Sequence, residues 1–296
     1  MRNFIDLHIH SIYSDDGEYT PEALVKKCKN ANIKIMAITD HNTISGIEEE
    51  KEYCKKAGIT CIPGIEIDCT FKSVNLHIIG YGIDYSKEEI QAIEENILKQ
   101  ELSKAKEKLI LTNALGFELQ EDDLKAISIS GIWTGEMFGE ILLSKEIYKD
   151  HEILKPYRKS GERSDNPYVN FYWDFYSQGK PCYTEIEYPA LDNSIKIIHK
   201  YGGVAVLAHP GHNLKNNFEL FDDMVSLGLD GVEAFSSYHN NQAIDYFYRK
   251  GKEKHLLITC GSDYHGKTKP AVAIGNSKCN IDQSIIKEQS LEYGLL

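Results

Sequence analysis

The chain has 296 residues, 42% hydrophobic and 26% charged, so it is long enough for one enlarged domain or for a domain with an insertion. Its 45 acidic and 33 basic residues leave a net charge of −12, which excludes a general attraction to long nucleic acid or to an anionic membrane. No apolar run reaches the roughly 18 residues of a membrane helix. The seven cysteines are scattered and show no Cys-x-x-Cys spacing. We therefore expect free thiols and a cytoplasmic protein.

The first predicted element is a strand over residues 4–10, where apolar and polar residues alternate. His8 and His10 lie two positions apart on it, so their side chains point to the same side, with Cα atoms about 6.6 Å apart. Two such imidazoles can bind one ion from opposite flanks. An isolated pair is more often solvated or hydrogen-bonded, so a metal site depends on partners elsewhere in the chain.

Polar residues also mark the next strands. Thr20 and Pro21 predict the start of a helix, with Thr20 as its N-cap. Further strands are expected over residues 35–39, 60–67 and 76–81, and they carry Asp40 and His41, Glu66, and His77.

The same alternation resumes near residue 192. Strands are predicted over residues 204–208, 231–235 and 256–260, separated by helices over 218–227 and 243–250. The first of these strands runs into His209, and the last is followed by Asp263 and His265. Seven strands alternating with helices indicate an α/β fold, either a β/α barrel or an open parallel sheet.

Residues 86–188 differ from the rest of the chain in composition. A long charged helix is predicted first, and an irregular, aromatic-rich stretch follows it. We interpret this segment as a mainly helical cap inserted over the mouth formed by the C-terminal strand ends. Residues 1–85 and 189–296 would then form the main domain. A separate domain with no role at the site is the alternative.

Nine candidate metal ligands collect at these strand ends. Because the C-terminal ends of parallel strands converge on one site, their joint placement carries more weight than any one residue. Mixed imidazole and carboxylate ligation suits Mn, Zn or Fe, and nine ligands imply two or three divalent ions. The nine are His8, His10, Asp15, His41, Glu66, His77, His209, Asp263 and His265.

The order of these motifs resembles that of the PHP family, the polymerase and histidinol phosphatase domains. The resemblance rests on Asp-Leu-His-x-His-Ser (6–11), Ile-Thr-Asp-His-Asn-Thr (38–43), Gly-Ile-Glu (64–66), Ala-His-Pro (208–210) and Gly-Ser-Asp-x-His (261–265). It implies a distorted seven-stranded (β/α)7 barrel with a trinuclear site. One ion would be held by His8, His10, Glu66 and Asp263, a second by Glu66, His77 and His209, and a third by Asp15, His41 and His265.

The activity implied is hydrolysis of a small phosphomonoester by a metal-bridged hydroxide. Asp40, His212 and His239 are candidates for proton transfer or for supporting the ligands, although each can also be a capping or solvated residue. Arg158, Arg163 and Lys180 in the cap are candidates for binding the substrate phosphate.

Chain length and the position of the insertion most resemble the bacterial branch that acts on nucleoside 3′,5′-bisphosphates and trims RNA from its 5′ end. Small phosphorylated molecules and short oligonucleotides are the partners this implies. Two arginines of that branch are replaced here, one by His212 and one within the segment Trp133–Glu136. Because arginines recognise phosphate, the substrate can differ, and histidinol phosphate is the second candidate.

Two other classes of protein fit the same ligands. The first is a metal-dependent hydrolase of a non-phosphate ester or an amide, since the same activated water serves these bonds. The second is a non-catalytic metal-binding module.

Overall fold

The computed structural model describes residues 3–86, 88–128, 131–215 and 217–296, which form an α/β fold. Its strands are β1 (Ile5–Ile9), β2 (Ile35–Ile38), β3 (Thr60–Cys61), β4 (Gly64–Phe71), β5 (Val74–Tyr81), β6 (Val204–Leu207), β7 (Gly231–Ser236) and β8 (Leu257–Gly261). Its α-helices are α1 (Pro21–Asn30), α2 (Ile47–Ala57), α3 (Glu88–Ala114), α4 (Glu121–Lys125), α5 (Gly135–Ser144), α6 (Pro167–Phe175), α7 (Leu191–Lys200), α8 (Pro210–Asn213), α9 (Leu220–Val225), α10 (Asn241–Glu253) and α11 (Gln283–Glu292). Short 3-10 helices are η1 (Glu146–Tyr148), η2 (Glu152–Tyr157) and η3 (Gly266–Thr268).

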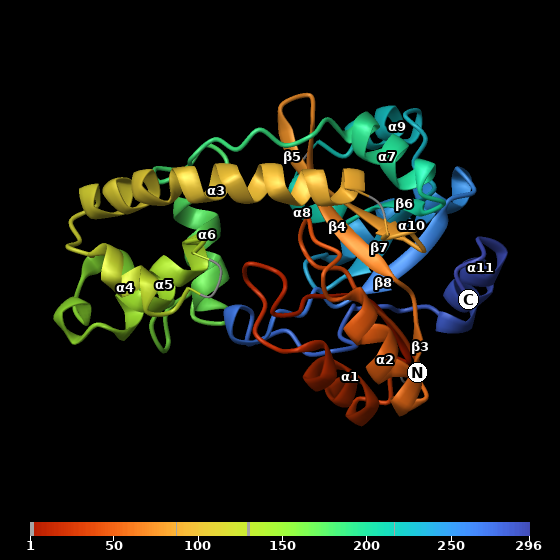
Figure 1. Cartoon of the computed structure of the whole chain (residues 1–296), viewed down its shortest axis with the longest axis horizontal. Helices are drawn as coiled ribbons and strands as arrows, with labels where there is room; N and C mark the ends of the chain where they lie inside the picture. The colour runs from red at the N-terminus through yellow and green to blue at the C-terminus, as the bar shows by residue number, and fades with distance from the viewer. Residues whose placement is uncertain (1–2, 87, 129–130, 216) are drawn as a thin grey trace.

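The strands form two sheets, and neither sheet is closed among the described residues. One has the order β1-β2-β3 and the other β4-β5-β6-β7-β8. Single parallel bridges join them, between Ile9 and Tyr264 and between His41 and Glu66. The α/β class is therefore confirmed, whereas a closed seven-stranded ladder is not what the hydrogen bonds show. Figure 1 shows α1 and α2 below the labelled strands β4, β7 and β8, and α7 and α9 above them.

The described residues form eight strands where seven were predicted, because residues 60–71 form two strands. The direction of one strand also differs from a parallel sheet, since β5 runs antiparallel to both of its neighbours. β4 and β5 make a hairpin through Lys72 and Ser73, whose φ angles of 47° and 64° are those of a two-residue type I′ turn. Asn-Gly is the common sequence for such a turn, so the residues Lys72 and Ser73 did not predict a hairpin. The start of β5, with His77, consequently lies at the ligand end of the sheet.

The predicted helical insertion leaves the main domain after β5 and returns before α7. The 27-residue helix α3 runs from the strands to α4, α5 and α6 (Figure 1). These helices have a hydrophobic core of their own, which includes Phe138, Leu142, Leu154 and Phe171, separate from the cores around the sheets.

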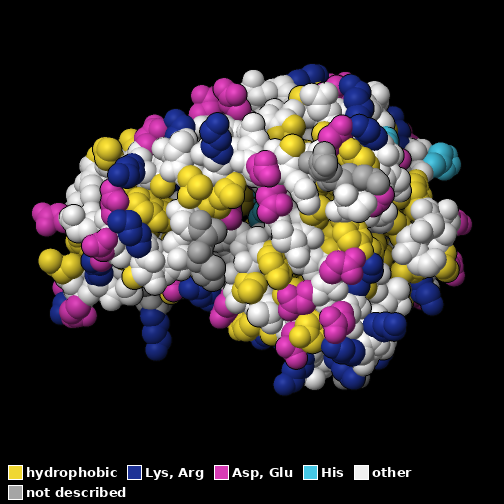
Figure 2. All heavy atoms as spheres, viewed as in Figure 1, with side chains coloured by type: hydrophobic (Ala, Val, Ile, Leu, Met, Phe, Trp, Pro, Cys, Tyr) yellow, Lys and Arg dark blue, Asp and Glu magenta, His cyan; other side chains and the backbone are white. Residues whose placement is uncertain are grey.

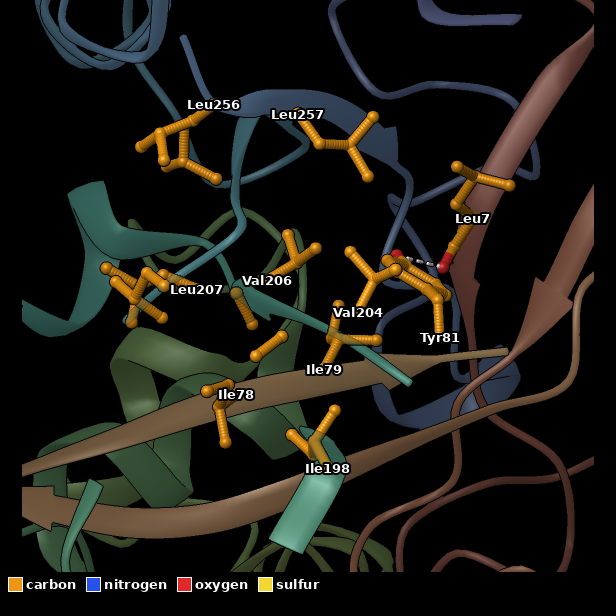
Figure 3. Packing of buried hydrophobic residues seen from close by; sticks show 14 of the residues in the cluster. Leu7, Ile78, Ile79, Tyr81, Ile198, Val204, Val206, Leu207, Leu256 and Leu257 are labelled. Carbon is orange, nitrogen blue, oxygen red and sulfur yellow. Dashed lines mark hydrogen bonds between the residues drawn. The ribbon is translucent and has the colours of Figure 1, made fainter. Parts of the chain in front are cut away.

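The largest core lies between the five-stranded sheet and α7, α9 and α10. Ile78 and Ile79 of β5 pair with Leu207 and Val206 of β6, and Figure 3 shows these residues on neighbouring strands, with Tyr81 beside Leu7. Tyr81 is fully buried, and its hydroxyl donates a 2.8 Å hydrogen bond to the carbonyl oxygen of Leu7. This bond links the two sheets.

We expect Tyr81→Phe to lower the free energy of unfolding by about 1–2 kcal/mol, because the Leu7 carbonyl would lose a buried donor. Urea denaturation checks this. Tyr13→Phe is the matched control, since the Tyr13 hydroxyl meets Glu49 at the surface and its loss should cost less than about 0.5 kcal/mol. Equal losses in the two variants would contradict a link between the sheets.

The surface agrees with the composition. On the face drawn in Figure 2, Lys and Arg side chains are interspersed with Asp and Glu, and no continuous basic area is visible. Within the described part of the chain, no helix is both long and apolar enough to cross a membrane.

Candidate metal centre

Four of the predicted ligands converge where β1, β4 and β8 meet. Glu66 Oε2 lies 3.1 Å from both His8 Nε2 and His10 Nε2, and these two nitrogens lie 3.0 Å apart. Asp263 Oδ1 completes the group at 3.4 Å from His8 Nε2 and 3.2 Å from His10 Nε2. With metal–ligand bonds of about 2.0–2.1 Å, the edges of a tetrahedron are roughly 3.3 Å long. The four atoms therefore have the spacing of a tetrahedral site.

Glu66 reaches a second group with its other oxygen. Oε1 lies 3.0 Å from His77 Nδ1 and 3.0 Å from His209 Nε2. His41 Nδ1 lies 3.4 Å from Glu66 Oε2. The ligand atoms of His41, Glu66 and His77 lie within 4.8 Å of one another. Glu66 thus lies between two groups of imidazoles, with Oε2 toward His8 and His10 and Oε1 toward His77 and His209.

The third group differs from the expectation at one residue. His10, His41 and His265 are joined by Asp16, whose Oδ2 lies 3.1 Å from His265 Nε2. Asp15 belongs to no ligand group of the described residues and lines the adjacent cavity instead, where burial raises its pKa to about 7. In the structure it is thus Asp16, and not Asp15, that lies in this group of ligand-type side chains.

Asparagine substitutions distinguish the two aspartates. We expect Asp16→Asn to lower the bound-metal stoichiometry and to reduce kcat/KM about 10-fold to 100-fold, because a neutral amide replaces a carboxylate that faces His265. Asp15→Asn should leave the metal content unchanged. Elemental analysis of the two variants, purified in parallel, checks the assignment, and the opposite ranking would restore Asp15 as the ligand.

Besides Asp16, sequence reasoning missed two carboxylates and one lysine. Asp68 Oδ1 lies 3.2 Å from His77 Nε2 and 3.4 Å from His41 Nδ1. Glu233 is fully buried on β7, where Oε1 lies 3.0 Å from His8 Nδ1 and Oε2 accepts the His209 N–H at 2.8 Å. Lys269 lies 2.6 Å from Asp263 Oδ2 and is 5% exposed. Asp68 falls two residues after Glu66 on one strand, so the alternation of β4 is the signal that could have found it.

The backbone at two of the ligands is strained. His209 and Asp263 have φ angles of 23° and 55°, in the region that non-glycine residues seldom adopt. Such residues cost about 1–3 kcal/mol each and cluster at functional sites, where surrounding contacts hold them. Here the Glu233 carboxylate and the His8 carbonyl accept the backbone N–H groups of His209 and Asp263.

The residues fit divalent ions. His41 Nδ1, Asp68 Oδ1 and His265 Nε2 are buried and have no hydrogen-bond partner among the described residues, although each lies near other ligand atoms. Buried polar atoms without partners are costly, and a cation satisfies them. Burial also lowers the pKa of His10 to about 4, so its imidazole is neutral and able to ligate.

The structure places the three proposed proton-transfer residues in different roles. Asp40 accepts hydrogen bonds of 2.6 Å from both the backbone N–H and the hydroxyl of Ser11, and burial raises its pKa to about 6. His239 is buried, with Nδ1 bonded to the Ala234 carbonyl and Nε2 accepting the Gly211 N–H. Both side chains therefore brace loops that carry ligands.

His212 lies closer to the chemistry. Its ring packs between Trp173 and Tyr238, with centroid distances of 4.2 and 4.3 Å, and also lies near His209. Burial holds the pKa of His212 well below its usual range, so the ring is neutral near pH 7.

The three cap residues expected to bind phosphate lie elsewhere. Arg158 donates to the carbonyl oxygens of Leu143 and Tyr148 inside the cap. Arg163 is paired with Asp174, and Lys180 is exposed. None of the three lines the cavity beside the ligands, where the basic residues are Lys108 and Lys269.

That cavity has a volume of about 150 Å³ and lies between the ligand groups and the cap. The ligands Asp16, His41, His77, His209 and Asp263 line one side, together with Asp68. The cap contributes an aromatic wall, which includes Tyr172, Trp173, Tyr176, Tyr183 and Tyr188. Residues of the segment 86–188 therefore line the same cavity as the candidate ligands.

An α/β fold that gathers buried imidazoles and carboxylates around one cavity defines a metal-dependent hydrolase. The chain belongs to the PHP domain family, whose model matches residues 6–222, and it is a metal-dependent phosphoesterase.

Relatives and solved structures agree with this assignment. The chain is 26% identical over 268 residues to the phosphoribosyl 1,2-cyclic phosphate 1,2-diphosphodiesterase of Eggerthella lenta, covering 88% of this chain and 94% of that protein. It is 26% identical over 280 residues to the 3′,5′-nucleoside bisphosphate phosphatase of Chromobacterium violaceum, covering 93% and 91%. A structure from Bifidobacterium adolescentis, assigned as a metal-dependent phosphoesterase, superposes with a TM-score of 0.77 at 25% identity and covers 97% of this chain and 95% of that one.

Proposed function

We propose that the chain removes phosphate from a small phosphomonoester, of the nucleotide or nucleoside bisphosphate type, at a centre of two or three Mn, Zn or Fe ions. The observation that carries this proposal is the cavity, one side of which is formed by ligand groups that share Glu66. Residues 1–85 and 189–296 are the catalytic domain, in which the two sheets act together as a distorted seven-stranded barrel. Residues 86–188 are the cap that closes over the substrate.

The ions would be held by three groups. The first is His8, His10, Glu66 and Asp263, the second Glu66, His41, His77, Asp68 and His209, and the third His10, Asp16, His41 and His265. Bound divalent ions supply an activated water near neutral pH and screen the charge of a phosphoryl group. With no cap arginine in the cavity wall, phosphate affinity would come mainly from these groups.

The chain's own side chains orient the rest of the substrate. Tyr238 and Trp173 both line the cavity. Tyr238 Oη and Trp173 Nε1 are buried and have no hydrogen-bond partner among the described residues. Lys269 Nζ lies 4.9 Å from the Tyr238 ring centroid. These donors face the space where the phosphate and its ester oxygen would lie. His212, neutral and packed edge-on against Trp173 and at a tilt against Tyr238, would contact the leaving group.

The aromatic wall favours a substrate with a planar group, such as a nucleobase. We expect Trp173→Leu to raise KM for a nucleotide about 3-fold to 10-fold, because a stacked aromatic contact is worth about 0.5–1.5 kcal/mol. KM for glycerol 2-phosphate, which has no ring, should change little. Steady-state kinetics with both substrates check this. An equal rise in KM for the two substrates would show that Trp173 stabilises the fold and does not contact the nucleobase.

The experiment that tests the function combines elemental analysis of the purified protein with a phosphate-release screen. The screen includes nucleoside 3′,5′-bisphosphates, mononucleotides, histidinol phosphate, a ribose cyclic phosphate and a 5′-phosphorylated short oligoribonucleotide. We expect metal-dependent turnover of at least one small phosphate ester. Cleavage of amides or lactones without phosphate release, or no metal bound after purification without chelator, would overturn the proposal.

A cytoplasmic location is proposed as well. All seven cysteines are free thiols, including the neighbouring pair Cys260 and Cys279. A reducing compartment keeps adjacent thiols in this form.

A further inference from the structure

A second cluster of ligand-type side chains lies outside the hydrolytic centre. Glu50 and Cys54 are one turn apart on the buried face of α2, and Cys61 lies on β3. Their ligand atoms lie within 4.8 Å of one another. None of the three lines the cavity described above, and Figure 1 shows α2 and β3 on the side of the main domain away from the cap.

Glu50 has an unsatisfied carboxylate oxygen. Its side chain is 0% exposed, and Oε1 accepts a 2.8 Å hydrogen bond from the Ile38 N–H. Oε2 is buried and has no hydrogen-bond partner among the described residues. Burial raises the pKa of Glu50 well above its usual range, so the free carboxyl holds a proton. A cation in contact with Oε2 would replace that proton and satisfy the oxygen.

Two free thiols stand beside this oxygen. Cys54 is 1% exposed and Cys61 is half-buried. A hydrogen bond between the two thiols lowers the pKa of Cys54 and raises that of Cys61. Ligands of a tetrahedral ion lie roughly 3.3–3.8 Å apart for Zn–O and Zn–S bonds of about 2.0 and 2.3 Å. The three side chains can reach this spacing by small rotations, and the partial exposure of Cys61 leaves a path for an ion and for one water ligand.

We propose that Glu50, Cys54 and Cys61 bind one thiophilic divalent cation of the Zn²⁺ type, at a site separate from the hydrolytic centre. Two sulfur ligands disfavour Mg²⁺ and Ca²⁺, which prefer oxygen. Binding releases three protons, one from the Glu50 carboxyl and one from each thiol, and forms one metal–oxygen and two metal–sulfur bonds. The ion ties α2 to β3 and, through the Ile38 hydrogen bond, to β2. It is a structural site that plays no part in hydrolysis.

Sulfur ligands allow the two centres to be measured separately, because the hydrolytic centre contains only nitrogen and oxygen ligands. The full-length protein is stripped with chelator and titrated with Co²⁺, and the sulfur-to-cobalt charge-transfer absorption is followed. We expect the wild type to reach saturation at about one sulfur-ligated ion per chain. Cys61→Ser should abolish the band. Glu50→Gln, which keeps an oxygen for the Ile38 N–H, should weaken binding at least about 10-fold.

Matched controls separate this site from the other thiols. Cys279→Ser, which breaks the pair with Cys260, and Cys69→Ser, in a buried strand position, should both keep the band. Phosphate release by Cys61→Ser should equal that of the wild type. The cobalt band tests the thiol site and phosphate release tests the phosphoesterase proposal, so either proposal can fail without the other. Absence of the band in the wild type, or its loss in Cys279→Ser but not in Cys61→Ser, would overturn the site. Circular dichroism confirms that each variant is folded.

Discussion

Replacing Glu66 with glutamine is expected to reduce kcat/KM by at least about 10³-fold, or roughly 4 kcal/mol of transition-state stabilisation. Glu66 is fully buried, and its two oxygens face different ligand groups at 3.0–3.1 Å. An amide has one oxygen and one N–H₂ group, so it cannot serve both groups. The loss should therefore appear both in turnover and in the number of ions bound per chain, measured by elemental analysis.

Glu185→Gln is a suitable control, since Glu185 is exposed on the segment that returns from the cap. Its kinetics and metal content should match those of the wild type. Should Glu66→Gln keep its full metal complement and lose less than about 10-fold in activity, Glu66 would not be a shared ligand.

Replacing Lys269 with methionine should impair both stability and catalysis. Lys269 Nζ lies 2.6 Å from Asp263 Oδ2, and both side chains are buried. Although burial alone would raise it, the neighbouring Lys269 and histidines hold the pKa of Asp263 well below its usual range. Removing one partner of such a pair costs about 3–5 kcal/mol, because the other charge stays buried. The metal-free variant should show this loss in urea denaturation, and kcat/KM should fall about 10²-fold or more.

The loss of stability should be smaller in the metal-loaded variant, since cations bound near Asp263 offset the missing ammonium. Lys267→Met is the matched control two residues away. Lys267 is 46% exposed and pairs with Glu140 at the surface, so it should cost no more than about 1 kcal/mol. An equal loss with and without metal would mean that Lys269 supports the fold without supporting the ligand.

Most residues of the candidate metal centre could be picked out from the sequence because strand ends follow a simple rule. His8, His10, Glu66, His209 and Asp263 lie on or just beyond apolar strands, and neighbouring strands bring them together. That rule does not reach into loops. Asp15 and Asp16 are adjacent, and which of the two carboxylates lies beside His265 depends on how residues 11–17 fold back. A Cβ at Gly17 would lie 1.9 Å from the Ser11 carbonyl oxygen, a close approach that no local pattern announces.

Contacts between segments far apart in the chain could not be predicted from the sequence either. Arg158 and Arg163 are basic residues of the inserted segment, and their positive charge suggested phosphate binding. Their partners are carbonyl groups and Asp174 within the cap. Lys269, which does line the cavity, follows a metal ligand by six residues without any strand or helix signal. Local patterns identify the type of a side chain, whereas the direction it points depends on tertiary packing.

The antiparallel direction of β5 has a consequence for how this protein can change. Because β5 begins at the ligands, it ends at Tyr81, beside the first residue of β6 and at the opposite edge of the sheet. The first junction of the cap, after Tyr81, therefore lies at the edge remote from the ligands, whereas the second lies beside the end of β4, where the Thr70 N–H donates to the Pro189 carbonyl oxygen. At about 1.5 Å per residue, the 27 residues of α3 extend about 40 Å, enough to carry the cap back to the cavity. Since β1, β4 and β8 lie outside the insertion, a different cap between these junctions would alter the aromatic wall of the cavity, while the strands next to the ligands would keep their sequence.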